Sequence, residues 1–105
     1  MKIWVDDVRH PPDWERGTDQ YVWCQSVNQA KNAIEYFEEW FRVELIDLDH
    51  DAGDYAKDGG DYIKILDWLE ETGRNYPIHI HSMNPVGVQN MRAIIQHNGW
   101  KDIRY

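Results

Sequence analysis

Carboxylate and imidazole side chains gather at the ends of three strand-like runs of this sequence. The runs end, in chain order, in Asp6 and Asp7, in Asp49, His50 and Asp51, and in His81 and Ser82. Carboxylates held close together repel one another unless a cation or a shared proton relieves them. Hard oxygen ligands suit Mg²⁺ or Mn²⁺, and added imidazole also admits zinc or ferrous iron. The pattern therefore predicts a divalent-metal site, magnesium or manganese by preference, with the ligands Asp6, Asp7, Asp49 and Asp51.

A second group of residues has the chemistry to hold a phosphate. Asn84 and Pro85 are typical of a helix start, and Gly87 in the first turn permits close approach to the backbone. Helix N-termini attract anions, and a guanidinium can bind a phosphate. We therefore expect the substrate to be bound by Arg9, Ser82, Asn84 and Gly87. Carboxylates that hold a metal, next to hydrogen-bond donors that hold a phosphate, predict phosphate-ester chemistry. We expect the catalytic residues to be Asp49, His50 and His81.

Each of these residues also has a purely structural interpretation. An aspartate after a strand is often a turn or capping residue, and Arg9 suits a salt bridge as well as a phosphate. His79 fits a structural or interface role, and the run DGGD at 58–61 lacks the lysine of a P-loop and is typical of a turn. The coincidence of the acidic groups at 6–7 and 49–51 at matching strand ends favours function for the cluster as a whole.

The elements that must position these residues alternate along the chain. The predicted strands cover 2–7, 20–25, 43–49, 78–82 and 102–105. The predicted helices cover 27–41, 61–72 and 85–98. Alternating strands and helices predict a parallel sheet, whose ligands bind outside the carboxyl ends of the strands. The first connection, 8–19, contains Pro11 and Pro12 and is close to the shortest length for a parallel crossover.

Apolar and polar residues alternate within the strands, whereas a sheet covered on both faces has continuous apolar runs. One face would carry Ile3, Val5, Val22, Cys24, Ile46, Leu48, Ile78, Ile80 and Ile103. The other would carry Lys2, Trp4, Tyr21, Trp23, Asp47, Asp49, His79, His81 and Arg104. We therefore expect the helices mainly on one face and a bare aromatic face that joins two copies as a homodimer. The alternative is that the loop 8–19, with Trp14, folds back over this face.

Composition narrows the class of protein. The 105 residues suit a single domain, 1–105, and the net charge of −8 argues against binding to extended duplex DNA. The single cysteine, Cys24, forms no intrachain disulfide and fits a buried structural role. We expect no signal peptide, and no apolar run approaches the roughly 20 residues of a membrane span. We expect a cytoplasmic protein without membrane contact.

The motifs resemble those of a known fold. An acidic pair after the first strand, Asp49 after the third and Ser82 after the fourth resemble response-regulator receiver domains, although no helix follows the first strand and no lysine ends the fifth. The runs WVDDVR at 4–9, LIDLDHDAGD at 45–54 and HSMNPVG at 81–87 are similar to the cyclic-phosphate-processing receiver-like family. This resemblance implies a receiver or flavodoxin-like α/β fold of about five parallel strands that lacks the first and fifth receiver helices. It also implies a role with cyclic or terminal phosphates of RNA or nucleotides.

Three functions fit these observations. The first is a metal-dependent phosphoesterase whose partner is a small nucleotide or an RNA phosphate end. The second is a receiver-like module that binds a nucleotide or a protein without turnover. The third is a partner-binding protein, for example of phage type, that works through its acidic, tryptophan-rich surface. The second histidine, which ordinary receivers lack, favours chemistry.

Overall fold

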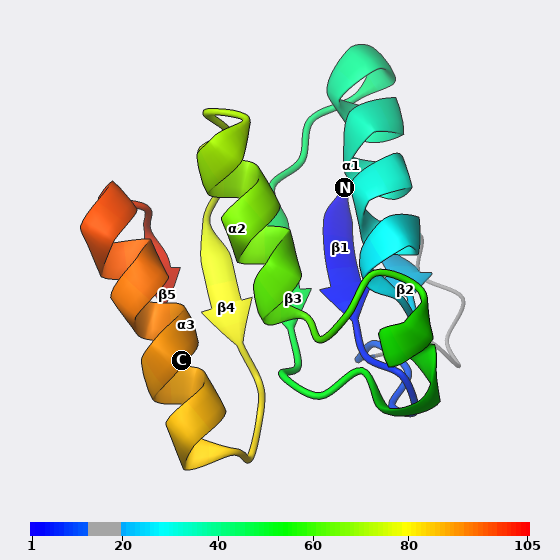
Figure 1. Ribbon diagram of the computed structural model, residues 1–105. Helices are drawn as coiled ribbons and strands as arrows, with labels where there is room; N and C mark the ends of the chain where they lie inside the picture. Colours follow the sequence, from blue (N-terminus) through cyan, green and yellow to red (C-terminus); the bar gives the residue numbers. More distant parts are fainter. Residues whose placement is uncertain (13–19) are drawn as a thin grey trace.

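The computed structural model describes residues 1–12 and 20–105, which form a sheet with helices packed against it (Figure 1). The strands are β1 (Lys2–Val5), β2 (Tyr21–Cys24), β3 (Leu45–Leu48), β4 (Ile78–Ile80) and β5 (Asp102–Ile103). The α-helices are α1 (Val27–Trp40), α2 (Ile63–Glu71) and α3 (Pro85–Asn98), and a 3₁₀ helix, η2 (Gly53–Lys57), lies between β3 and α2, where no element was predicted. The predicted order of elements is confirmed, and the observed strands are shorter than expected.

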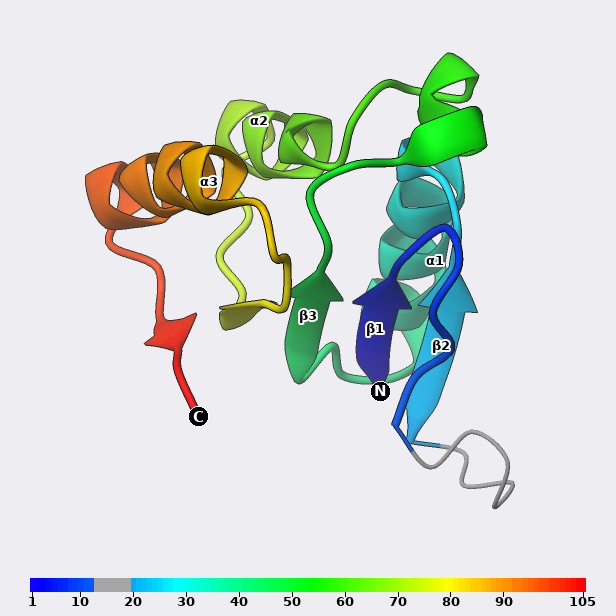
Figure 2. The same ribbon diagram turned by 90° about the horizontal axis from the view of Figure 1, so that it is seen from below.

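The order of the strands across the sheet is β2-β1-β3-β4-β5, and all pairs are parallel. The predicted parallel sheet is therefore confirmed, including the β1–β2 pair that the short first connection joins. The order reverses at β1, which lies between β2 and β3. Ligands of open parallel sheets bind at such a reversal. The residues that follow β1 and β3 therefore lie beside each other at the carboxyl edge, where the arrowheads of these two strands lie side by side in Figure 2.

The three α-helices cover one face of the sheet (Figure 1). The core between the layers joins strand residues such as Ile3 and Ile46 to helix residues such as Ile34, Leu66 and Met91, all fully buried. Local signals determine where the helices begin and end. The Ser26 hydroxyl accepts from the Gln29 amide at the start of α1, Asn84 caps α3, and Gly73 adopts a positive φ after α2.

The opposite face of the sheet is partly covered by the chain itself. Trp4 is only 8% exposed, and its indole Nε1 donates to the Arg9 carbonyl at 2.8 Å. The Trp23 indole donates to the Asp6 carbonyl at 2.8 Å. The segment 6–9 after β1 therefore contacts Trp4 and Trp23, which agrees with the described part of the alternative interpretation, that the loop 8–19 covers this face. Trp14 lies outside the described residues, and the homodimer stays a prediction that the burial of Trp4 weakens.

Two details of the prediction were wrong. Ile103 pairs with His79 in the sheet register and so lies on the face away from the helices, whereas Asp102 lies beside Arg92 of α3. Phe41, included in the predicted helix 27–41, lies after the end of α1 at Trp40 and is 61% exposed. None of the helices among the described residues has the length and apolar character needed to cross a bilayer.

Candidate functional site

Three carboxylates meet at the carboxyl edge of the sheet. Asp6 and Asp7 follow β1, and Asp49 follows β3. One oxygen from each lies within 4.8 Å of the others, which is the spacing of groups that can share a cation. The parallel register of β1 and β3 produces this arrangement, because it brings the ends of the two strands to the same level. The sequence-predicted cluster of Asp6, Asp7 and Asp49 thus comes together in the structure.

Asp6 is the anchor of this edge. Its fully buried carboxylate accepts from the amides of Val8 and Arg9 at one oxygen, and from Arg9 Nε and His81 Nε2 at the other, all at 2.8–3.0 Å. Burial opposes its charge, but the Arg9 and Val8 amides, His81 and the Arg9 guanidinium together hold the pKa of Asp6 below its ordinary value. Since each carboxylate oxygen already accepts two hydrogen bonds, Asp6 is better suited to orient the other groups than to bind a metal directly.

The surroundings of Asp7 disfavour the charged form of its carboxyl group. Burial raises the pKa of its carboxyl, and the neighbouring charges of Asp6, Asp49 and Asp54 raise it further, although its own backbone amide lowers it. Gly53 makes this packing feasible, because its φ of 55° brings the backbone close and a Cβ there would collide with the Asp7 carboxylate. A carboxylate crowded by three others is the group that a bound cation would stabilise most.

Arg9 bridges two of the carboxylates. Its Nε lies 3.0 Å from Asp6 Oδ2, and its Nη2 lies 3.5 Å from Asp49 Oδ2. The Arg9 side chain is 48% exposed, so the guanidinium is fixed on one side and accessible on the other. Both expectations for Arg9 are therefore compatible: it forms a salt bridge and still presents donors to an incoming anion.

His50 lies beneath the start of α3. Its Nδ1 is 3.0 Å from Asp51 Oδ1, and a Cβ on Gly87 would collide with its ring. Asp51 is not drawn into the carboxylate cluster, because its side chain is directed to His50 and, at 3.5 Å, to Asn84. The Gly87 amide donates to Asn84 Oδ1. Gly87 thus serves the packing of His50, and its amide is already satisfied by the helix cap.

His81 lies between two carboxylates. Its Nε2 is 3.0 Å from Asp6 Oδ2, and its Nδ1 is 2.6 Å from Asp47 Oδ1. Its ring stacks on Trp4, with centroids 3.9 Å apart and planes 4° from parallel. Both ring nitrogens therefore have acidic partners, and the indole fixes the ring plane. His81 is positioned to hold Asp6 in place.

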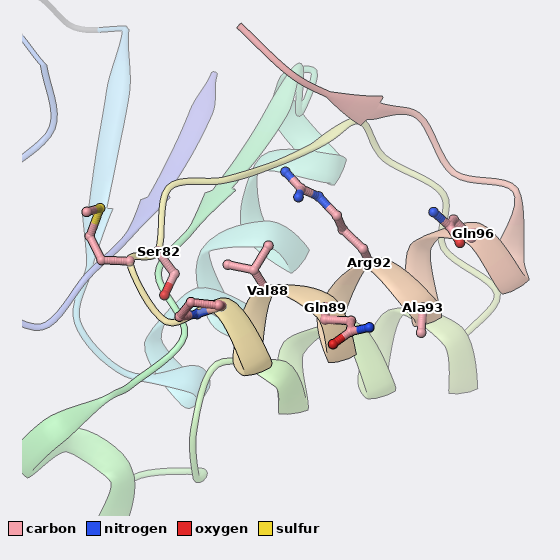
Figure 3. A pocket seen from close by; sticks show the side chains of 8 residues that line it. Ser82, Val88, Gln89, Arg92, Ala93 and Gln96 are labelled. Atoms are coloured by element: carbon pink, nitrogen blue, oxygen red, sulfur yellow. The ribbon is translucent and has the colours of Figure 1, made fainter.

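A hollow of about 720 Å³ runs along α3 beside this edge (Figure 3). Ser82 lies at one end and Gln96 at the other, with Val88 and Arg92 between them. The Ser82 hydroxyl accepts from the Asn84 amide, so it also braces the loop before α3. This volume suits a ligand the size of a nucleoside. The hollow itself contains none of the clustered carboxylates.

Comparison with known families agrees with this geometry. A family model described as "Cyclic-phosphate processing Receiver domain" matches residues 1–97. The chain belongs to this receiver family. The predicted resemblance is confirmed, and the family description associates this receiver with the processing of cyclic phosphates. No curated protein and no solved structure matched the chain.

Several residues near the carboxyl edge of the sheet were given no site role by the sequence analysis. Residue parity placed Trp4 and Asp47 on the same sheet face as the predicted catalytic His81, but only the structure shows that both contact its ring. Gly53 and Asp54 lie in η2, which carries no strand or helix signal strong enough to place it beside Asp7. The glycine after a buried, acidic strand end was the signal that could have indicated close backbone approach there.

Proposed function

We propose that this receiver is a metal-dependent phosphoesterase that acts on cyclic or terminal phosphates of nucleotides or RNA. The observation that carries the proposal is the meeting of Asp6, Asp7 and Asp49 beside the Arg9 guanidinium. An acidic cluster whose three charges one guanidinium offsets only in part attracts a divalent cation, and the exposed side of that guanidinium can recognise a phosphate. The family description supports a cyclic phosphate as the substrate.

The residues divide into distinct roles in this proposal. Asp7 and Asp49 would hold the metal, because the acceptor sites of Asp6 are taken by Arg9, Val8 and His81. A magnesium or manganese ion bound there would polarise the phosphoryl oxygen and activate water. Arg9 would hold the phosphate through the nitrogens that face away from Asp6.

His50 is better suited than His81 to transfer a proton. The ring of His50 has one nitrogen near Asp51, an arrangement that orients an imidazole for acid or base catalysis. Both nitrogens of His81 face carboxylates, and Trp4 fixes its ring, so His81 would act as a positioning residue through Asp6. The remainder of a nucleotide would extend toward the hollow along α3, where Ser82 lies at the near end.

Turnover assays on defined substrates test the proposal. A 2′,3′-cyclic nucleotide and an RNA ending in a 2′,3′-cyclic phosphate would each be incubated with Mg²⁺, with Mn²⁺ or with EDTA. We expect metal-dependent hydrolysis that falls by about 10²-fold or more in Asp49→Asn and in His50→Gln. Asp67→Asn, which changes an acidic residue of α2 paired with Lys64, serves as the matched control and should keep full activity.

The assays also separate turnover from binding. Hydrolysis that persists in EDTA, or that survives Asp49→Asn, would contradict the proposed metal role. Binding of the cyclic nucleotide by calorimetry without any hydrolysis would instead support a receiver that senses a nucleotide.

A further inference from the structure

A second cluster of metal-ligating side chains lies on the sheet face away from the helices. Asp47 of β3 and His79 of β4 are direct neighbours in the sheet register, and His81 follows two residues later on the same face. Asp47 Oδ1 lies 2.8 Å from His79 Nδ1 and 2.6 Å from His81 Nδ1. Three potential ligand atoms therefore lie within 4.8 Å of one another.

The Asp47 carboxylate is buried and depends on these two rings for its hydrogen bonds in the described part of the chain. The Asp47 side chain is 5% exposed, and in the described part of the chain the hydrogen bonds to its carboxylate come from the two imidazoles. A carboxylate only accepts hydrogen bonds, and a neutral imidazole nitrogen without a proton only offers a lone pair. Either protons or a metal ion must therefore lie between Asp47 and the rings.

The outer contacts of the cluster match those of a metal centre. A histidine that binds a metal through one nitrogen commonly donates its other N–H to a carboxylate, which fixes the ring. His81 has this arrangement, since its Nε2 lies 3.0 Å from Asp6 Oδ2 while its Nδ1 faces the cluster. Trp4 stacks on the His81 ring, and Tyr105 packs against the His79 ring at 4.6 Å. Both imidazoles are therefore held in place before any ion arrives.

We propose that Asp47, His79 and His81 form a zinc-class transition-metal site on this face. Two imidazoles and one carboxylate form a ligand set that zinc accepts, with a fourth position open to water. Metal bonds of about 2.1 Å in a tetrahedron separate the ligand atoms by about 3.4 Å. The Asp47–imidazole distances of 2.8 and 2.6 Å therefore need to open by about 0.6 and about 0.8 Å. The site uses none of the carboxylate oxygens assigned to magnesium or manganese at Asp7 and Asp49, so it does not depend on the proposed hydrolysis.

The zinc ion alone is the probe that tests this site. Titration calorimetry with Zn²⁺ would be run on the full chain in the Asp7→Asn and Asp49→Asn double variant, which removes the other acidic cluster. We expect this background to bind zinc in a 1:1 ratio. Adding His79→Ala should weaken binding by about 100-fold or more, because it removes a direct ligand. His97→Ala, which removes an exposed histidine from the last turn of α3, is the matched control and should bind as before.

A spectroscopic readout keeps the proposal testable if a variant misfolds. In the unsubstituted protein, Zn²⁺ should shift the Nδ1 resonances of His79 and His81, and it should leave those of His97 unchanged. Zinc binding that is unaffected by His79→Ala would overturn the proposal. An absence of zinc binding would do the same, and would mean that protons alone hold the cluster together. Neither result would bear on magnesium-dependent hydrolysis, which Asp49→Asn tests separately.

Discussion

The imidazole Nε2 of His81 lies 3.0 Å from Oδ2 of Asp6, although 75 residues separate the two in the chain. This contact links the end of β4 to the end of β1 across β3. It gives the buried Asp6 carboxylate one of the partners that stabilise its charge. It also joins the acidic edge to the cluster around Asp47, so the two candidate metal sites share one hydrogen-bonded chain.

Replacement of Asp6 should destabilise the fold more than replacement of any other carboxylate at this edge. In Asp6→Asn, the amide nitrogen would face Arg9 Nε and His81 Nε2, which are themselves donors. The loss of two hydrogen bonds to the carboxylate, one of them from the largely buried His81 ring, costs about 3 kcal/mol in total. Urea unfolding should show this loss for Asp6→Asn, and a change of less than about 0.5 kcal/mol for the exposed Asp51→Asn. Equal losses in the two variants would contradict the anchoring role.

Asp6 should also influence stability in acid. Its folded pKa is lowered, so its contribution is present above the unfolded pKa near about 4 and is lost as the pH falls through the folded pKa. The free energy of unfolding should therefore fall on acidification, and this fall should be shallower in Asp6→Asn. Denaturant unfolding at a series of pH values below about 5 measures the difference. Parallel curves for the two proteins would count against a lowered pKa.

Asp7→Asn should stabilise the metal-free protein. The folded pKa of Asp7 is raised by burial and by Asp6, Asp49 and Asp54, so ionisation destabilises the fold as the pH rises from the unfolded to the folded pKa. Above both values the penalty is fully present, and removing it should add about 1 kcal/mol. Mg²⁺ or Mn²⁺ should raise the Tm of the unsubstituted protein and leave that of Asp7→Asn unchanged. A lower metal-free stability for Asp7→Asn would show that other groups in the folded protein already offset the repulsion between Asp7 and its neighbouring carboxylates.

The sequence was sufficient to predict the fold and the acidic edge, because both follow from periodic patterns. Strand parity separated the helix-covered face from the aromatic face, and strand ends in a parallel sheet necessarily share an edge. It was not sufficient for β5, where the register shifts Ile103 to the face opposite the one expected. Nor did it decide between a bare aromatic face and one covered by the loop after β1, because the coverage of Trp4 depends on the backbone of Arg9 turning back to accept its indole N–H. Such contacts rest on loop conformation, and no periodicity in the chain encodes it.

The thiol of Cys24 should be inert in the folded protein. The side chain is 3% exposed, and burial raises the pKa of the thiol to about 12, so almost no thiolate exists at neutral pH. Reaction with a disulfide reagent at pH 8 should be slow in buffer and complete in guanidinium. Fast reaction in buffer would mean that β2 opens locally, since its folded position places Cys24 in the core.

Gly87→Ala tests whether the start of α3 is built around His50. A Cβ at residue 87 would collide with the imidazole ring, so the substitution must displace His50 or the helix. Overpacking of this kind costs about 1–3 kcal/mol. The proposed hydrolysis should fall as well, because a displaced ring loses its contact with Asp51.

Gly99→Ala supplies the contrast: its added Cβ would meet nothing within 4 Å, and the strain from its φ of 69° lies at the far end of α3. That variant should lose stability yet retain the kcat of the unsubstituted protein. If both variants lost stability but neither lost turnover, the position of His50 would be irrelevant to catalysis, and the proton would have to move through another group.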